Sequence, residues 1–370
     1  MLIHMDGFDV YKTVSDLTFQ YLTHSGTGLG TQAGRFGQGA VVFSGHGGDL
    51  GDPGIQLNFN VSYSDIWTGV AIYTADAGGL SGTVNFGTGD LGVFAFSSNL
   101  GWEGVITYNN FLGVWSFWTH TPSNSSSVPV YGGSGVFQTG TNVWHWVDIH
   151  YKPSNTTSGI VEIWVDDIRI LNLTNIVTTT WGGSTINIVT LGAVNNNIGP
   201  TNAIATYDDW YILDAASGEY NTTRLGDSRI YSQIPISDVA GHNNGVPSSG
   251  TNYFAMVDEP QNDGLTTYIT IQGTPGQEDI FNMSALPSEP PTIYANRVLN
   301  IVEQTAGGTI TGNAIIVSGG VIAQGPTQPL LSVFFSQFGI FEEDPNTSFP
   351  WTWEAINAAQ CGFIVANTAS

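Results

Sequence analysis

Residues 142–174 read NVWHWVDIHYKPSNTTSGIVEIWVDDIRILNLT and contain two runs in which apolar and polar residues alternate. A period of two over this length is typical of strands that bury one face. Residues 152–159, between the runs, favour a turn, because Pro cannot donate to a strand ladder and Gly tolerates positive φ. The stretch therefore predicts an antiparallel hairpin with one face on a core and the other face carrying aromatic and acidic side chains.

The outer face of this hairpin carries candidate residues for catalysis or binding. If the turn is centred on residues 155–156, Asp148 lies opposite Glu162 and Trp146 lies opposite Trp164. Opposed residues have Cβ atoms about 4.5–5.5 Å apart, and two carboxylates so close would share a proton or bind a cation. The Glu-x-Asp-x-x-Glu motif of jelly-roll glycosidases is absent, however, because the strand reads Glu-Ile-Trp-Val-Asp-Asp. We expect no catalytic residues and no enzyme, with a glycosidase as a minor alternative.

The same face is a candidate glycan-binding surface, formed by Trp146, His150, Glu162 and Trp164. Indole rings stack on the apolar faces of sugars, and His and Glu bond their hydroxyls. The alternative is that the two tryptophans lie in a core or an interface and that the polar residues form its rim. Because the chain is acidic, such a face is expected to favour neutral or cationic glycans.

Composition narrows the class of protein. The chain has 370 residues, 41% of them hydrophobic, which predicts two domains with sizeable cores. Lys and Arg number 7 against 30 Asp and Glu, for a formal charge of −23, which argues against partners such as nucleic acid or an anionic membrane. No run reaches membrane-spanning length and no signal peptide is recognisable, so we expect synthesis in a cytoplasm. The single cysteine, Cys361, excludes an intramolecular disulfide and is expected in the core.

The order of the segments predicts an all-β protein. Short alternating runs separated by Gly, Asn and Pro recur up to about residue 213, as in a jelly-roll sandwich, and we assign this domain to residues 1–222. A polar stretch at residues 225–252 marks the boundary. Residues 223–370 are predicted to form a smaller C-terminal β-sandwich with one short helix at 353–360, capped by Thr352.

No cofactor is expected, and one metal site stays open. Asp208 and Asp209 carry the oxygen ligands that Ca²⁺ needs. Neighbours on an alternating strand point to opposite faces, however, so we favour a structural role for this pair. The seven histidines show no metal-ligand spacing.

Several segments together resemble known families. Asp6-Gly-Phe-Asp9, Gly34-Arg-Phe-Gly37, the hairpin motifs at 144–147 and 161–167, and the strand at 207–214 resemble concanavalin A-like (laminin-G-like) jelly-roll domains. With the Leu-Gly-Asp-x-Arg segment at 225–229, Asp344-Pro-Asn-Thr347, Trp351-Thr352 and Asn357, their order resembles a family of tailed-phage virion proteins.

This resemblance implies an exterior structural protein of the virion: a head-decoration, head-fibre or tail-associated subunit present in many copies. Its partners would be other virion proteins and itself, as a homo-oligomer, with weak adhesion to a host-surface glycan as a further expectation. The abundance of Trp (11), Tyr (14) and Phe (19) agrees with an interface-forming protein, because aromatics are enriched at interface cores. The alternatives are a virion-borne or secreted glycan hydrolase and a stand-alone carbohydrate-binding module.

Overall fold

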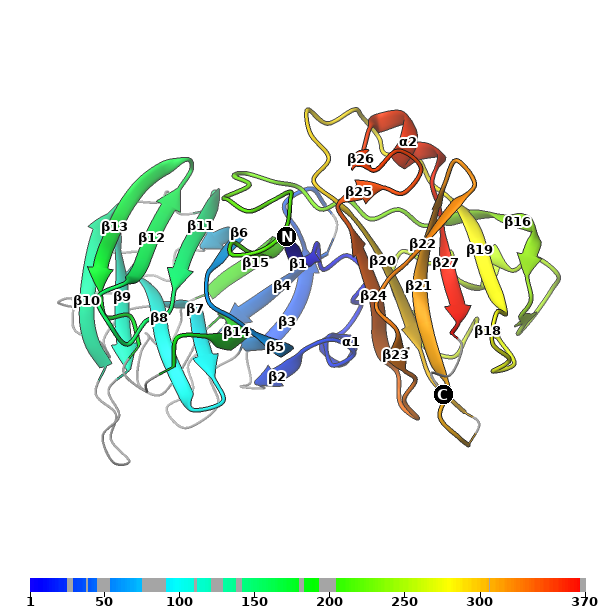
Figure 1. Ribbon diagram of the computed structural model, residues 1–370, viewed down its shortest axis with the longest axis horizontal. Coiled ribbons are helices and arrows are strands. Elements are labelled where there is room, and N and C mark those ends of the chain that lie inside the picture. Colours follow the sequence, from blue (N-terminus) through cyan, green and yellow to red (C-terminus); the bar gives the residue numbers. More distant parts are fainter. Residues whose placement is uncertain are drawn as a thin grey trace. The chain divides into compact units, whose positions relative to one another are not determined.

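The computed structural model describes residues 1–24, 29–37, 39–44, 54–74, 91–109, 112–120, 129–137, 142–179, 183–192, 204–305 and 307–366 (Figure 1). The chain divides into two compact units, one comprising Ile3–Ile230 and the other beginning at Tyr231. Residues 223–230, which the sequence analysis assigns to the second domain, therefore group with the first unit.

The first unit is a sandwich of two antiparallel sheets, as predicted. The first sheet has, in spatial order, β13 (Ile168–Ile176), β12 (Gly159–Val165), β11 (Trp144–Lys152), β6 (Ile66–Thr74), β15 (Ile204–Asp214), β4 (Gly39–Ser44) and β3 (Leu29–Ala33), with β1 (Leu2–Asp6) also paired to β15. The second sheet has β10 (Pro129–Val136), β9 (Val114–His120), β8 (Gly101–Asn109), β7 (Leu91–Ser98), β14 (Ile186–Gly192), β5 (Gly54–Tyr63) and β2 (Leu22–His24).

The core of this unit lies between the two sheets. Alternate residues of β11 and β12 point into it, and Ile149 and Ile163, which are cross-strand partners, have no exposed surface. From the second sheet, Phe96 stacks on Tyr151 with ring centroids 4.3 Å apart. Many of the abundant aromatics thus fill this core, among them Trp115 and Trp210.

The hairpin exists, but its predicted register is wrong by two residues. His150 pairs with Glu162, and Asp148 pairs with Trp164. The connection is held by Ser154, whose hydroxyl contacts those of Thr156 and Ser158 at 3.0 and 2.8 Å. A shift of two residues preserves the face to which each side chain points, which is why the alternation is right although the pairs are not.

The opening Asp6-Gly-Phe-Asp9 segment anchors the N-terminus to the core. Asp6 accepts hydrogen bonds from the hydroxyls of Tyr11 and Tyr21 at 2.8 and 2.6 Å. Asp9 accepts from the backbone of Gly39 at 2.9 Å. A short helix, α1 (Val14–Leu17), follows, and the sequence analysis missed it although Thr13-Val-Ser-Asp16 is a capping-box sequence.

The second unit is also built of antiparallel strands. Its largest sheet has β16 (Pro235–Asn243), β19 (Glu278–Met283), β27 (Gln360–Val365), β21 (Thr311–Ser318) and β22 (Val321–Gln324), with β23 (Gln328–Pro329) paired to β21. The described two-stranded pairs are β17 (Val246–Pro247) with β18 (Ile269–Thr270), β20 (Asn296–Val302) with β24 (Phe335–Phe341), and β25 (Glu343–Asp344) with β26 (Phe349–Pro350). A single 3₁₀ turn, η1 (Phe254–Met256), lies between β17 and β18.

The predicted helix is present as α2 (Trp353–Ala358). Its N-cap is Thr352, whose hydroxyl accepts from the backbone of Ala355 at 3.2 Å, as predicted. Ile356 and Trp351 pack in a small core with Ile316. Cys361 is partly buried and packs against this core, and burial raises the pKa of its thiol to about 12.

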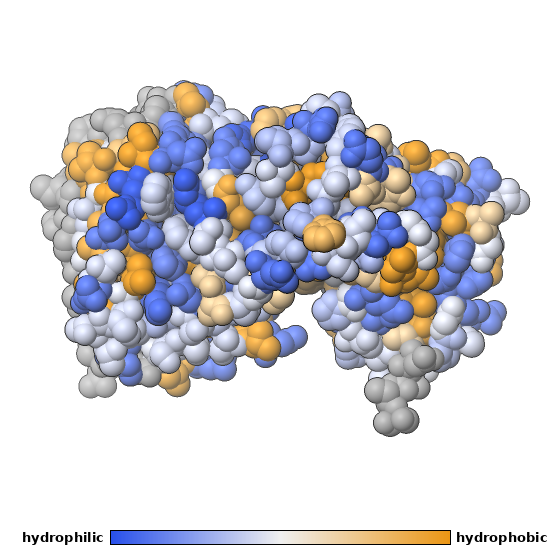
Figure 2. Space-filling view, turned by 45° about the horizontal axis from the view of Figure 1, so that its top comes forward, coloured by the Kyte–Doolittle hydropathy of each residue, from blue (hydrophilic) through white to orange (hydrophobic). Residues whose placement is uncertain are grey.

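Figure 2 shows one face of the molecule, on which apolar residues are scattered among hydrophilic ones. Among the most exposed large apolar side chains of the described residues are Phe349 and Leu265, at 68% and 66%. The homo-oligomer stays a prediction. No described helix has both the length and the apolar character needed to span a membrane.

A pair of substitutions tests which side chains of β12 and β13 face the core. Ile163 is fully buried and Ile168 is 55% exposed. We expect Ile163→Ala to lower the free energy of unfolding by about 2–5 kcal/mol because it leaves a cavity. Ile168→Ala should change it by no more than about 0.5 kcal/mol. Urea denaturation of the full chain measures both, and equal effects would mean that the two residues do not differ in burial.

Candidate functional site

The predicted glycan-binding residues all lie on the outer face of the first sheet, but they do not form one exposed surface. Strands β6, β11 and β12 are adjacent there. His150, Glu162 and Trp164 are half-buried, whereas Trp146 is only 2% exposed. Trp146 therefore has almost no surface to offer a sugar, in line with the alternative that it lies in a core. The glycan-binding prediction rests on the other three residues.

Asp148, the proposed partner of Glu162, is also withdrawn from the surface. Its carboxylate is fully buried and accepts from the Tyr211 hydroxyl at 2.7 Å and from the Arg224 guanidinium at 3.1 Å. Burial raises the pKa of Asp148, and the bonds from Tyr211 and Arg224 oppose this shift. The predicted Asp148–Glu162 pair does not form because the register brings His150 opposite Glu162 instead.

His150 is the centre of the exposed part of this face. Its Nε2 lies 2.6 Å from Asp65 Oδ1, and its Nδ1 lies 3.3 Å from Glu162 Oε2. Both carboxylates accept, so the ring satisfies both only when each nitrogen carries a proton. The imidazole also stacks on Trp67, with centroids 4.5 Å apart and planes 9° apart. The ring is thus fixed at both edges and on one face.

Two partly exposed cations complete this group, which we call the His150 site: Asp65, Trp67, His150, Lys152, Glu162, Trp164 and Arg169. The Lys152 ammonium lies 3.5 Å from Asp65, and the Arg169 guanidinium lies 2.9 Å from Glu162. The two side chains are 40% and 45% exposed. Asp65 and Trp67 were missed by the sequence analysis. Asp65 directly precedes β6, and Trp67 is the second residue of that strand.

Trp164 joins the His150 site to a second network. Its ring lies 5.5 Å from the Arg169 guanidinium carbon and 4.4 Å from that of Arg224, within cation–π range. Arg224 also bonds Asp167 at 2.6 Å. Arg224 begins a segment, residues 224–230, that we call the strap and that includes the Leu-Gly-Asp-x-Arg sequence.

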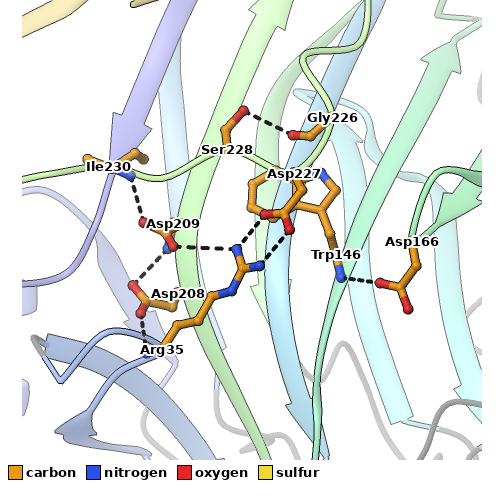
Figure 3. Close-up of polar contacts among 9 residues, drawn as sticks. All are labelled: Arg35, Trp146, Asp166, Asp208, Asp209, Gly226, Asp227, Ser228 and Ile230. Atoms are coloured by element: carbon orange, nitrogen blue, oxygen red, sulfur yellow. Dashed lines mark hydrogen bonds and ion pairs between the residues drawn. The ribbon is translucent and has the colours of Figure 1, made fainter. Parts of the chain in front are cut away.

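The strap lies against the first sheet and is held at several points (Figure 3). The backbone N–H of Leu225 donates to the Tyr211 hydroxyl at 3.0 Å, and that of Ile230 donates to Asp209 at 2.7 Å. Between them, Asp227 makes a two-pronged pair with Arg35 at 2.5 and 2.6 Å. No feature of the sequence alone indicated that this segment packs on the sheet.

Asp208 and Asp209 both lie next to Arg35, which corrects the expectation that they point to opposite faces. β15 bulges between Asp208 and Tyr211, and Asp209 has a φ of 54°. The bulge breaks the alternation. Asp208 accepts from the backbone N–H groups of Arg35 and Asp209 at 2.7 and 2.8 Å.

Burial raises the pKa of both carboxyls. The pKa of Asp208 rises to about 7 and that of Asp209 to about 8, and for Asp209 the neighbouring Asp208 adds to the effect of burial. Arg35 partly offsets both shifts. Among the described residues, no group of three His, Cys, Asp or Glu side chains is arranged to hold a metal ion, and at this pair the nearby cation is Arg35.

No protein-family model and no curated protein matches the chain. Among solved structures, the PL-14 alginate lyase from Aplysia kurodai is 13% identical with a TM-score of 0.39, over 51% of this chain and 87% of that one. An endo-β-1,4-glucuronan lyase from Trichoderma reesei is 13% identical with a TM-score of 0.37, over 57% and 90%. An alginate lyase from Chlorella virus is 13% identical with a TM-score of 0.36, over 50% and 88%.

These solved structures are polysaccharide lyases, which contradicts the expectation that this protein is not an enzyme. That expectation rested on a missing glycosidase motif, and we do not carry it further. The resemblance to phage virion proteins is tested by none of the comparisons and stays a prediction.

The buried aspartate pair predicts how stability depends on pH. The folded pKa values of about 7 and 8 lie above the value of about 4 for an unfolded Asp. The folded state therefore holds more protons than the unfolded state, and the free energy of unfolding should fall as the pH rises through 7 and 8. The slope should approach about 1.4 kcal/mol per pH unit for each proton.

Asp209→Asn should flatten this dependence, because the amide does not titrate and Asn tolerates positive φ. Chemical denaturation of the first unit's transition from about pH 6 to about pH 9 measures the slope. A wild-type stability that rises over this range would contradict the assignment.

Proposed function

We propose that the protein binds glycans and that the N-terminal jelly roll recognises a neutral polysaccharide at the His150 site. One observation carries the proposal: a histidine ring is stacked on Trp67 and fixed at both nitrogens, beside the half-buried Trp164. Sugar sites combine an aromatic surface with a few polar groups held in fixed positions. The His150 site has both.

The polar groups of the site keep bonding capacity for a ligand. Glu162 uses one oxygen for His150 and the other for Arg169, and each carboxylate oxygen has two lone pairs. Arg169 has five N–H donors, of which the bond to Glu162 uses one. A sugar hydroxyl both donates and accepts, so it suits a site in which acceptors and donors alternate.

Charge favours a neutral ligand. Within the site, Asp65 and Glu162 are matched by the cations that they contact, whereas the whole chain carries a formal charge of −23. A polyanion would be repelled by the chain and would find each cation of the site already paired. We therefore expect recognition of hydroxyls rather than of carboxylates.

The test is affinity measured by calorimetry against a panel of neutral and acidic polysaccharides. Trp164→Ala and Glu162→Gln should each weaken binding about tenfold, or about 1.4 kcal/mol, while the fold survives. Trp144→Ala is the matched control, because Trp144 is a half-buried tryptophan of the same strand as His150 but packs on Tyr73. It should leave the affinity unchanged.

Binding that survives Trp164→Ala and Glu162→Gln would place the glycan elsewhere and overturn the proposal, as would the absence of binding across the panel. The same mixtures are assayed for new chain ends, so that cleavage of a bound polysaccharide is detected together with binding.

A virion location is a separate proposal, supported by the order of the sequence segments. Mass spectrometry of purified tailed-phage particles that encode this chain should find it as an exterior component. Its absence from intact particles would remove this location and leave glycan binding untouched.

A further inference from the structure

Arg35 lies between two competing acidic partners, one in the strap and one in the sheet. Its Nη1 is 2.5 Å from Asp227 and 4.0 Å from Asp209 (Figure 3). The partners differ in environment, because the Asp227 side chain is 50% exposed and that of Asp209 is 2% exposed. Water can therefore solvate Asp227 but not Asp209.

Asp209 has one oxygen satisfied and one not. Its Oδ1 accepts from the backbone of Ile230, whereas its Oδ2 is buried without a hydrogen-bond partner among the described residues. A buried oxygen without a donor costs much less free energy when the carboxyl is neutral than when it is charged. The present arrangement, in which Arg35 pairs with Asp227, thus suits a neutral Asp209.

We propose that Arg35 is a pH-dependent latch for the strap: it holds Asp227 while Asp209 is neutral, and it turns to Asp209 when that carboxyl ionises, which frees the strap around Ser228. The step is the loss of one proton from Asp209 to solvent, followed by an exchange of ion-pair partners.

The balance of the two ion pairs drives the exchange. The Asp227 side chain is 50% exposed, so water can replace Arg35 as its partner at small cost. A buried carboxylate without a counter-charge is strongly unfavourable, so the guanidinium gains most by moving to Asp209 once it is charged. The raised pKa of Asp209, about 8, places the exchange just above neutral pH.

Other charged groups also surround Asp209 and Arg35. Asp208 and Asp9 both raise the pKa of Asp209 through their negative charges, while Arg35 lowers it. Arg229 of the strap packs its guanidinium 4.0 Å from the Phe36 ring, next to Arg35 in the chain. Ionisation of Asp209 therefore adds negative charge next to the Arg35 guanidinium, which is 17% exposed, and draws it away from Asp227.

Cysteine labelling of the strap tests the latch in the full-length protein. Ser228→Cys places a thiol next to Asp227, and the native Cys361 should stay unlabelled because its pKa is about 12. The rate of reaction with a maleimide is divided at each pH by that of an unstructured peptide of the same sequence, which removes the titration of the thiol itself. We expect the corrected rate to rise about tenfold from about pH 6 to about pH 9.

Four further proteins serve as controls for this measurement. Thr223→Cys, at an exposed position before the strap, should show no such rise. In the Ser228→Cys background, Asp209→Asn should keep labelling slow at both pH values. Asp227→Asn should make it fast at both, because Arg35 has lost its partner in the strap. Asp258→Asn, which removes one charge from the second unit, should keep the wild-type response.

A corrected rate at residue 228 that does not change with pH would overturn the latch. So would a wild-type rise that persists in the Asp209→Asn protein, since another group would then be responsible. Circular dichroism at each pH confirms that the fold is intact. If Asp209→Asn does not fold, Asp208→Asn is the second variant: it removes a charge that raises the pKa of Asp209, so the rise in labelling should move to lower pH, and a rise at unchanged pH would overturn the latch.

Discussion

The structure of the first unit depends on the burial of alternate residues of β11 and β12 between two sheets. Val147, Ile149 and Tyr151 point inward and have no exposed surface. Because side chains alternate along a strand, the residues between them are forced to the outer face whatever their chemistry. The outer position of Trp146, Asp148 and His150 is therefore a consequence of packing. How deeply each is buried depends on what covers it.

The strap determines which of these side chains are covered. Arg224 reaches Asp148, and the backbone of Leu225 reaches Tyr211, whose ring stacks on Trp146. This part of the outer face becomes a second, polar interior in which buried carboxylates are matched by guanidinium groups and backbone donors. His150 and Glu162, further along the same strands, remain half-buried and are held by side chains of the sheet itself. One face thus contains both a closed network and an open site.

Sequence alone predicts the features that follow from local periodicity. The alternation of the hairpin, the two β-rich parts and the capped helix after Thr352 are of this kind, because each depends on neighbours in the chain. Periodicity does not predict the hairpin register, because the contacts of Ser154 in the turn set it. The burial of Trp146 and the bulge that turns Asp209 toward Asp208 depend on residues far away in sequence, such as Arg35 and Ile230. Composition also gave no hint that Asp65 would fix the ring of His150.

The central claim is that the open part of the outer face, and not the part under the strap, contacts a glycan. Oxidative footprinting of the tryptophans, with and without a bound polysaccharide, tests it most directly. Trp164 should react in the free protein and be protected by the ligand, whereas Trp146, at 2% exposure, should stay unreactive in both states. Protection of Trp146 by the ligand, or an unchanged reactivity of Trp164 when the polysaccharide is bound, would contradict the account.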